Sequence, residues 1–86
     1  MNSNRIYSIL KAVLADLTNK KKSEIFANDS LRTNLRFNNQ GLFSLAVDLN
    51  RAFKEEGLQI KPKLHGDETT AAQTVRDLRI LISGRF

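Results

Sequence analysis

The stretch NNQGLFSLAVDLNRAF, residues 38–53, carries the most regular pattern in this chain. Its apolar residues recur at intervals of three and four, the spacing that places side chains on one side of an α-helix; they are Leu42, Leu45, Ala46, Leu49 and Phe53. Phe43 and Val47 are expected to widen this apolar face. The stretch therefore predicts an amphipathic helix over residues 40–56.

The two ends of this helix also have sequence signals. An asparagine side chain accepts hydrogen bonds from the free N–H groups of a first helical turn, so Asn38 or Asn39 can cap the start. Glycine adopts the left-handed conformation that commonly ends a helix, and Gly57 lies where it is needed.

Residues 4–18 predict a second amphipathic helix, which Ser3 or Asn4 can cap. Its apolar side chains also recur at three- and four-residue intervals; they are Ile6, Ile9, Leu10, Val13, Leu14 and Leu17. This helix would lie against the same core.

The C-terminal part predicts a last helix that opens at Thr74. Thr74 and Asp77 form a threonine-x-x-acid capping pattern, and Gly84 marks the expected end. The residues expected to face inward are Val75, Leu78, Leu81 and Ile82. Residues 67–73 can add one short helical turn before it.

The two connections between these helices carry isolated apolar residues, in residues 19–37 and 57–68. We expect these residues to anchor the loops to the core; they are Ile25, Leu31 and Leu35 in the first loop, and Ile60 and Leu64 in the second. The complete pattern predicts an all-α fold, a small bundle of three main helices plus one short helix, without strands. It forms a single domain over residues 1–86 with a core over about residues 4–83.

The composition narrows the classes of function. With 86 residues, 41% of them apolar, the chain can bury one core layer between helices but not a large catalytic cavity, so we expect no enzymatic activity. It has no cysteine for a disulfide or a thiolate metal site. No signal peptide and no run of about 20 apolar residues is present, which favours the cytoplasm.

The charge is +5, from 14 Lys and Arg against 9 Asp and Glu. A small basic nucleic-acid-binding helical domain is one hypothesis for the function. The basic residues are scattered and no recognition helix is apparent, so this function ranks third among the hypotheses we consider, and a nucleic-acid partner is not expected. The run Lys20, Lys21, Lys22 is typical of a solvated loop. His65 is the only histidine, and one histidine without cysteines makes no zinc site, so we expect no bound metal.

The order and spacing of these elements resemble the acyl carrier protein family, which includes the peptidyl carrier domains. The resemblance covers about residues 6–82 and depends on an ordered set of positions: Leu17, Ile25, Leu31, Leu35, Leu45, Leu49, Phe53, Ile60, Pro62, Thr74, Val75, Asp77 and Leu78. It implies a carrier fold and a link to lipid, polyketide or nonribosomal peptide biosynthesis.

In that family an Asp-Ser-Leu motif opens the second helix, and the serine hydroxyl receives the 4'-phosphopantetheine arm. Counting back 14 residues from Phe53, as the family pattern requires, leads to Asn39, so the motif is replaced by Asn38-Asn39-Gln40. An amide nitrogen cannot be activated as an alcohol can, so Asn39 supplies no nucleophile for attachment. We therefore expect no covalent cofactor, while asparagine keeps the capping role of the position.

Two serines offer an alternative in which the chain is a working carrier. Asp29-Ser30-Leu31 spells the family motif literally, but Ser30 lies 23 residues before Phe53 and no sustained helical stripe follows it. Asp29 or Ser30 is better explained as a turn or capping group. Ser44 lies five residues after Asn39, about 140° further around the helix, where an arm would emerge from a different face.

The charge on the second helix indicates the kind of partner. The family's helix is acidic and meets basic enzymes, whereas here Asp48 is followed by Arg51 and Lys54. Like charges would repel a basic partner. We expect a monomeric, non-enzymatic protein-interaction module whose protein partner carries an acidic patch. The partner contacts are predicted to centre on Asn38, Asn39, Leu42, Phe43, Arg51 and Lys54.

Overall fold

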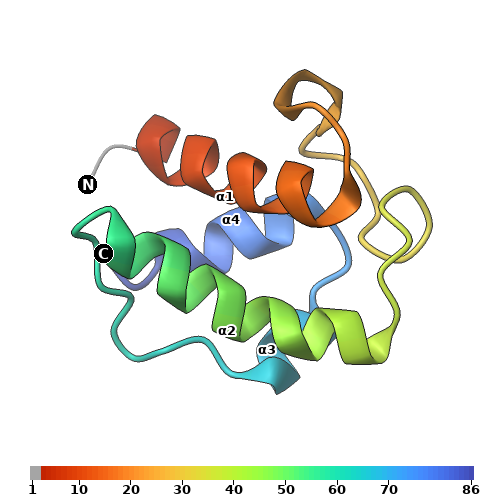
Figure 1. Ribbon diagram of the computed structural model, residues 1–86. Helices are drawn as coiled ribbons and strands as arrows, with labels where there is room; N and C mark the ends of the chain where they lie inside the picture. Colours follow the sequence, from red (N-terminus) through yellow and green to blue (C-terminus); the bar gives the residue numbers. More distant parts are fainter. Residues whose placement is uncertain (1–2) are drawn as a thin grey trace.

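The computed structural model describes residues 3–86 and contains four α-helices and one 3₁₀ turn within them (Figure 1). The helices are α1 (Ser3–Thr18), α2 (Asn39–Glu55), α3 (Gly66–Ala71) and α4 (Val75–Ser83), and the turn is η1 (Lys22–Glu24). The described part of the chain has no β-strand, only an isolated bridge between Ser30 and Thr74. The predicted all-α class, with three main helices and one short one, is confirmed.

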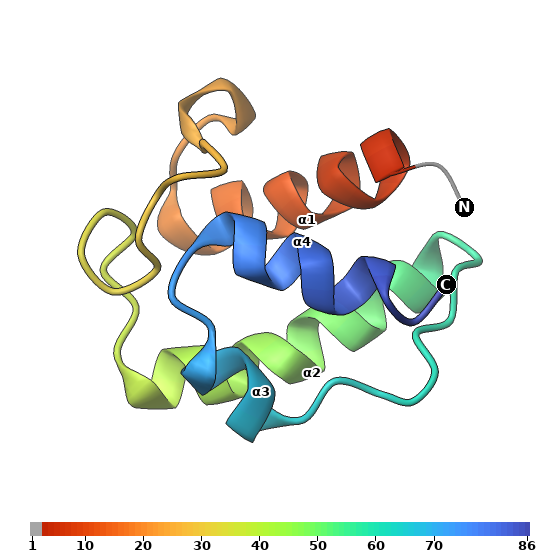
Figure 2. The same cartoon turned by 180° about the vertical axis from the view of Figure 1, so that it is seen from behind.

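The helices surround one core. α1 and α2 run in opposite directions side by side, α4 packs against α1, and the short α3 packs against α2 near its start (Figures 1 and 2). The predicted stripe of α2 is confirmed, because all five of its residues are buried. Burying a leucine or phenylalanine side chain contributes about 1.5–3 kcal/mol. This stripe is therefore a major source of stability.

Two expectations about the width of the apolar faces are wrong. Phe43 and Val47 are 55% and 54% exposed, so they do not widen the buried face of α2. Leu17 near the end of α1 is 46% exposed, whereas Leu81 of α4 is partly buried and packs against the core, as expected. Periodicity indicates which direction a helix faces, but the elements that pack against it decide how wide the buried stripe is.

The start of α2 is capped by Asn38, whose Oδ1 accepts a hydrogen bond of 2.7 Å from the Gly41 N–H. Asn39 is the first helical residue and not the cap. The predicted cap of α1 at Ser3 or Asn4 depends on residues at the edge of the described part of the chain, where α1 begins at Ser3.

The end of α2 has the expected glycine. Gly57 has a φ of 76°, the Leu58 N–H donates to the Phe53 carbonyl at 2.9 Å, and the Gly57 N–H donates to the Lys54 carbonyl at 3.0 Å. This pair of bonds is a Schellman motif, which satisfies two carbonyl groups that the helix itself leaves free.

The start of α4 confirms the predicted capping pattern. Thr74 Oγ1 accepts from the Asp77 N–H at 3.3 Å, and Asp77 Oδ2 accepts from the N–H groups of Gln73 and Thr74, both at 3.0 Å. These two backbone hydrogen bonds lower the pKa of Asp77 below its ordinary value of 3.8.

The long first loop is fixed to the start of α4. Its three predicted anchors are buried, as are those of the second loop; they are Ile25, Leu31, Leu35, Ile60 and Leu64. Three backbone hydrogen bonds of 2.9–3.1 Å add to this packing: Leu31 N to Gln73 O, Val75 N to Asp29 O, and Arg76 N to Ala27 O. The last two satisfy N–H groups that open α4 and have no partner inside that helix.

The C-terminal Arg85 holds the second loop and α3 against the end of α4. Its Nη2 donates to both carboxylate oxygens of Glu68 at 2.6 and 2.7 Å, and its Nε donates to the Pro62 carbonyl at 2.8 Å. The hydrogen bonds from Arg85, followed by one from the His65 N–H, lower the pKa of Glu68 below its ordinary value of 4.5.

Glu68 and Asp77 predict how stability depends on pH. A carboxylate whose pKa is lower in the folded than in the unfolded chain stabilises the fold above the unfolded pKa, and this contribution is lost as pH falls through the folded pKa. The free energy of unfolding should therefore fall between about pH 5 and about pH 2, as measured by urea denaturation. The fall should be smaller in Asp77→Asn than in the control Asp67→Asn, whose side chain accepts no hydrogen bond from the described residues. Equal falls in the two variants would contradict this account.

Candidate functional site

The two asparagines at the start of α2 have different roles. Asn38 is occupied by the cap, whereas the side chain of Asn39 is exposed and forms no hydrogen bond with any other residue in 3–86. Asn39 therefore presents a free amide to solvent. An amide is a hydrogen-bonding group without the nucleophilic oxygen that phosphoryl attack requires.

Ser30 has a structural role in the first loop. Its Oγ accepts from the Thr33 N–H at 3.1 Å, and its own N–H donates to Asn34 Oδ1 at 2.7 Å. Asp29 Oδ2 accepts from the Phe26 N–H at 2.9 Å. Both residues of the literal motif are thus turn groups, as their sequence context predicts. Ser44 is exposed within α2, in its second turn and not at its start.

Four exposed side chains form a continuous row along α2, which we call the outer face: Phe43, Val47, Arg51 and Lys54. Their intervals of four, four and three residues place them on one side of the helix. The side chains of Arg51 and Lys54 make no ion pair or hydrogen bond with the rest of the described chain. The outer face therefore joins two apolar groups to two positive charges that are available to another molecule.

Phe43 is held in place although it is more than half exposed. Gly66 at the start of α3 is buried beneath its ring, and a Cβ at that position would collide with the ring carbons. The glycine is therefore required for the close approach of α3 to α2. The supported ring is an aromatic group of fixed position, which costs little conformational entropy when a partner binds.

Leu42 does not belong to a contact surface, and its place among the predicted partner contacts is corrected. It is fully buried, and its carbonyl accepts a 2.5 Å hydrogen bond from the buried Thr69 hydroxyl. Leu42 instead helps to fix α3 to α2. The other predicted contacts are exposed: Asn38, Asn39, Phe43, Arg51 and Lys54.

A groove of about 520 Å³ borders the outer face, between α2 and the second loop. Val47, Ile60 and Leu64 contribute apolar surface to it. Its basic residues are Arg51, Lys54 and Lys63, and the exposed His65 also lines it. This basic groove extends the outer face with a third positive charge from the loop. The helical pattern alone could not reveal it, because Lys63 is outside any helix.

Asn50 fixes the loop wall of the basic groove. Its Nδ2 donates to the Leu64 carbonyl and its Oδ1 accepts from the Leu64 N–H, both at 3.0 Å. The side chain thus pairs with the loop backbone as a neighbouring strand would. The sequence gives no sign of this role, because the two residues are 14 positions apart and an asparagine on a helix is ordinarily solvated.

Comparisons with known proteins do not assign the chain, since no protein-family model and no curated protein sequence matches it. None of the helices within residues 3–86 is long and apolar enough to cross a membrane. No three histidine, aspartate or glutamate side chains of the described residues are grouped so that they could hold a metal ion.

The two hydrogen bonds between the Asn50 side chain and the Leu64 backbone, which we call the Asn50 clamp, should contribute measurably to stability. Asn50→Ala removes both hydrogen bonds to Leu64 and should lower the free energy of unfolding by about 1–3 kcal/mol, because partly buried polar groups lose their partners. Amide exchange at Leu64 should also become faster, as measured by NMR. Ser44→Ala is the matched control on the same helix and should neither lower the free energy of unfolding nor speed amide exchange at Leu64. Unchanged exchange at Leu64 in Asn50→Ala would contradict the clamp.

Proposed function

We propose that this chain is a non-enzymatic interaction module with an acyl-carrier-like fold, that it carries no covalent 4'-phosphopantetheine, and that it binds an acidic segment of a partner protein. The observation that carries the proposal is the outer face, where exposed Phe43 and Val47 continue into Arg51 and Lys54. Large exposed apolar groups beside unpaired charges are typical of a protein-binding surface.

The resemblance to the carrier family supports the choice of surface. In that family the second helix meets partner enzymes, and α2 occupies the corresponding place in the helix order. The opposite sign of its charge selects an opposite partner, because Arg51, Lys54 and Lys63 attract carboxylates and repel lysines. The same resemblance leads us to propose that the protein acts in lipid, polyketide or nonribosomal peptide biosynthesis.

We propose that the chain carries no 4'-phosphopantetheine arm because of the residues at the start of α2. Asn39 is exposed where an enzyme could reach it but has no hydroxyl, and Ser30 of the first loop uses its Oγ as an acceptor within its own turn. Partner binding would then replace covalent cargo as the function of α2. The module would act by bringing proteins together and not by carrying an acyl group.

An acidic amphipathic peptide tests this proposal. The probe is a helix-forming peptide of about 14 residues, with leucines on one side and glutamates on its flanks. Titrated into ¹⁵N-labelled protein, it should shift the amide signals of residues 43–54 and 58–65. The double variant Arg51→Glu with Lys54→Glu should bind about tenfold more weakly or worse, because two attractions become repulsions.

The control changes the same number of charges elsewhere. Lys20→Glu with Lys21→Glu alters two exposed lysines of the first loop and should leave the affinity close to that of the unmodified protein. An equal loss of affinity for the acidic peptide in the two double variants would show that the peptide is attracted by the net charge of the protein and not by the outer face, and would contradict the proposal. Tighter binding of a DNA duplex than of the peptide would also contradict it, in favour of a nucleic-acid-binding domain.

A further inference from the structure

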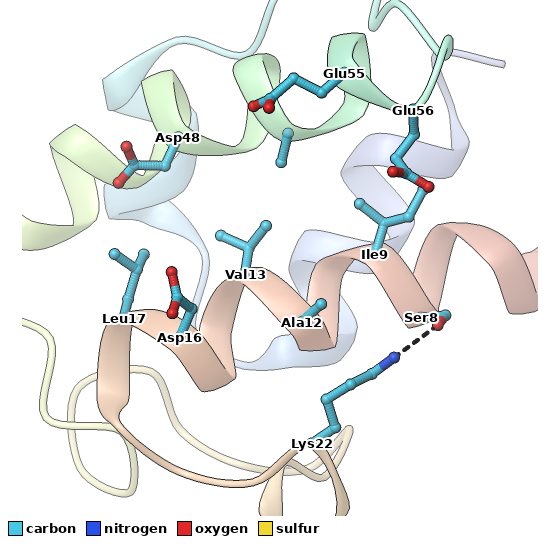
Figure 3. A pocket seen from close by; sticks show the side chains of 11 residues that line it. Ser8, Ile9, Ala12, Val13, Asp16, Leu17, Lys22, Asp48, Glu55 and Glu56 are labelled. Atoms are coloured by element: carbon cyan, nitrogen blue, oxygen red, sulfur yellow. Dashed lines mark hydrogen bonds between the residues drawn. The ribbon is translucent and has the colours of Figure 1, made fainter.

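A second groove, of about 640 Å³, lies between α1 and α2 on a different side of α2 from the outer face (Figure 3). Ile9, Val13 and Leu17 of α1 contribute its apolar surface. They are spaced four residues apart, so they extend over about 12 Å of helix. None of the three is fully buried.

The groove exists because two small residues face it. Ala12 of α1 and Ala52 of α2 line it with single methyl groups. Neither side chain is long enough to fill the space between the two helices. The apolar surface of α1 therefore stays accessible along the groove, where a larger residue would cover it.

Carboxylates line both sides of this groove. Asp16 extends from α1, and Asp48 and Glu55 extend from α2 (Figure 3). None of the three forms an ion pair or a side-chain hydrogen bond within residues 3–86. The only basic residue lining the groove is Lys22, which lies at its edge and donates to Ser8 Oγ at 2.9 Å. This groove is thus acidic on a chain with a charge of +5.

The acids elsewhere in the protein are largely used by the fold. Four of them accept backbone hydrogen bonds in turns and caps: Glu24, Asp29, Glu68 and Asp77. Glu56, at the end of this groove, faces Arg5 with 3.8 Å between the charged atoms. The carboxylates without a structural partner are therefore concentrated in the groove, with only Asp67 of α3 outside it.

We propose that this acidic groove binds a basic amphipathic helical segment of a partner protein. The carboxylates from both helices would pair with lysines and arginines on the two flanks of the segment, which gives the charge complementarity. The apolar row of α1 would take leucine-like side chains at intervals of three or four residues, the helix-in-groove mode of recognition. A small polyamine would leave that row uncovered, so an apolar and basic peptide fits the groove better.

This inference goes beyond the proposed function because it adds a second binding site of opposite charge. The outer face and the acidic groove lie on neighbouring sides of α2, so one helix would present two surfaces to two different segments. The protein would then join an acidic and a basic partner segment in one assembly.

The test uses a basic amphipathic peptide of about 14 residues, with leucines on one side and lysines on its flanks. In the unmodified protein it should shift the amide signals of residues 9–17 and 48–55. Asp16→Asn with Asp48→Asn should weaken binding about tenfold, because the loss of two charge pairs removes about 1.4 kcal/mol. Asp67→Asn removes an acid outside the groove and should leave the affinity unchanged.

A second variant tests the shape of the groove separately from its charge. Ala52→Leu should fill the groove and weaken binding of the basic peptide about tenfold. Binding of the acidic peptide to the outer face should stay unchanged. Circular dichroism should confirm that each variant is folded. The Arg51→Glu with Lys54→Glu variant should weaken only the binding of the acidic peptide, so the two sites are tested independently.

Three results would overturn this inference. The first is that the largest signal changes lie outside the segments that line the groove, residues 8–22 and 48–56. The second is equal affinity for the unmodified protein and for both the Asp16/Asp48 and Ala52 variants. The third is a dimer in sedimentation experiments that Ala52→Leu abolishes, because the occupant would then be a second copy of this chain.

Discussion

The buried row of Leu42, Leu45, Leu49 and Phe53 constrains the rest of the molecule, because α1 and α3 pack against α2 and α4 joins the same core through α1. A helix with one side buried must present its remaining surface to solvent or to a partner. On α2 that surface divides into an exposed apolar and basic row and an acidic groove. Both candidate binding surfaces therefore follow from the orientation that the core imposes on this helix.

The helices and the core were largely predictable from the sequence. The predicted bounds of α2 differ from the observed ones by one residue at each end, and the Thr74 and Asp77 pattern identified the start of α4. These features are local, since periodicity and capping depend on residues within one or two turns. The loop anchors were also predictable, because an isolated apolar residue in a polar segment gains most by burial.

The features that the sequence did not reveal depend on residues far apart in the chain. Phe43 is exposed because α3 covers only one side of its ring, through Gly66. Asn50 is a clamp because the second loop returns to α2 at Leu64. The acidic groove requires α1 and α2 to bring Ala12 and Ala52 to the same gap. Helical periodicity contains no information about contacts between residues far apart in the sequence, so only the folded structure shows them.

The proposed function depends most directly on the start of α2, where a carrier-like chain would lack the covalent chemistry of that family. Asn38 caps the helix, Asn39 is exposed without a hydroxyl, and Ser30 serves its own turn. The most direct measurement is the intact mass after incubation with coenzyme A and a phosphopantetheinyl transferase of broad specificity. The account predicts no increase in mass. An increase that peptide mapping places on Ser30 or Ser44 would contradict it and indicate a working carrier protein.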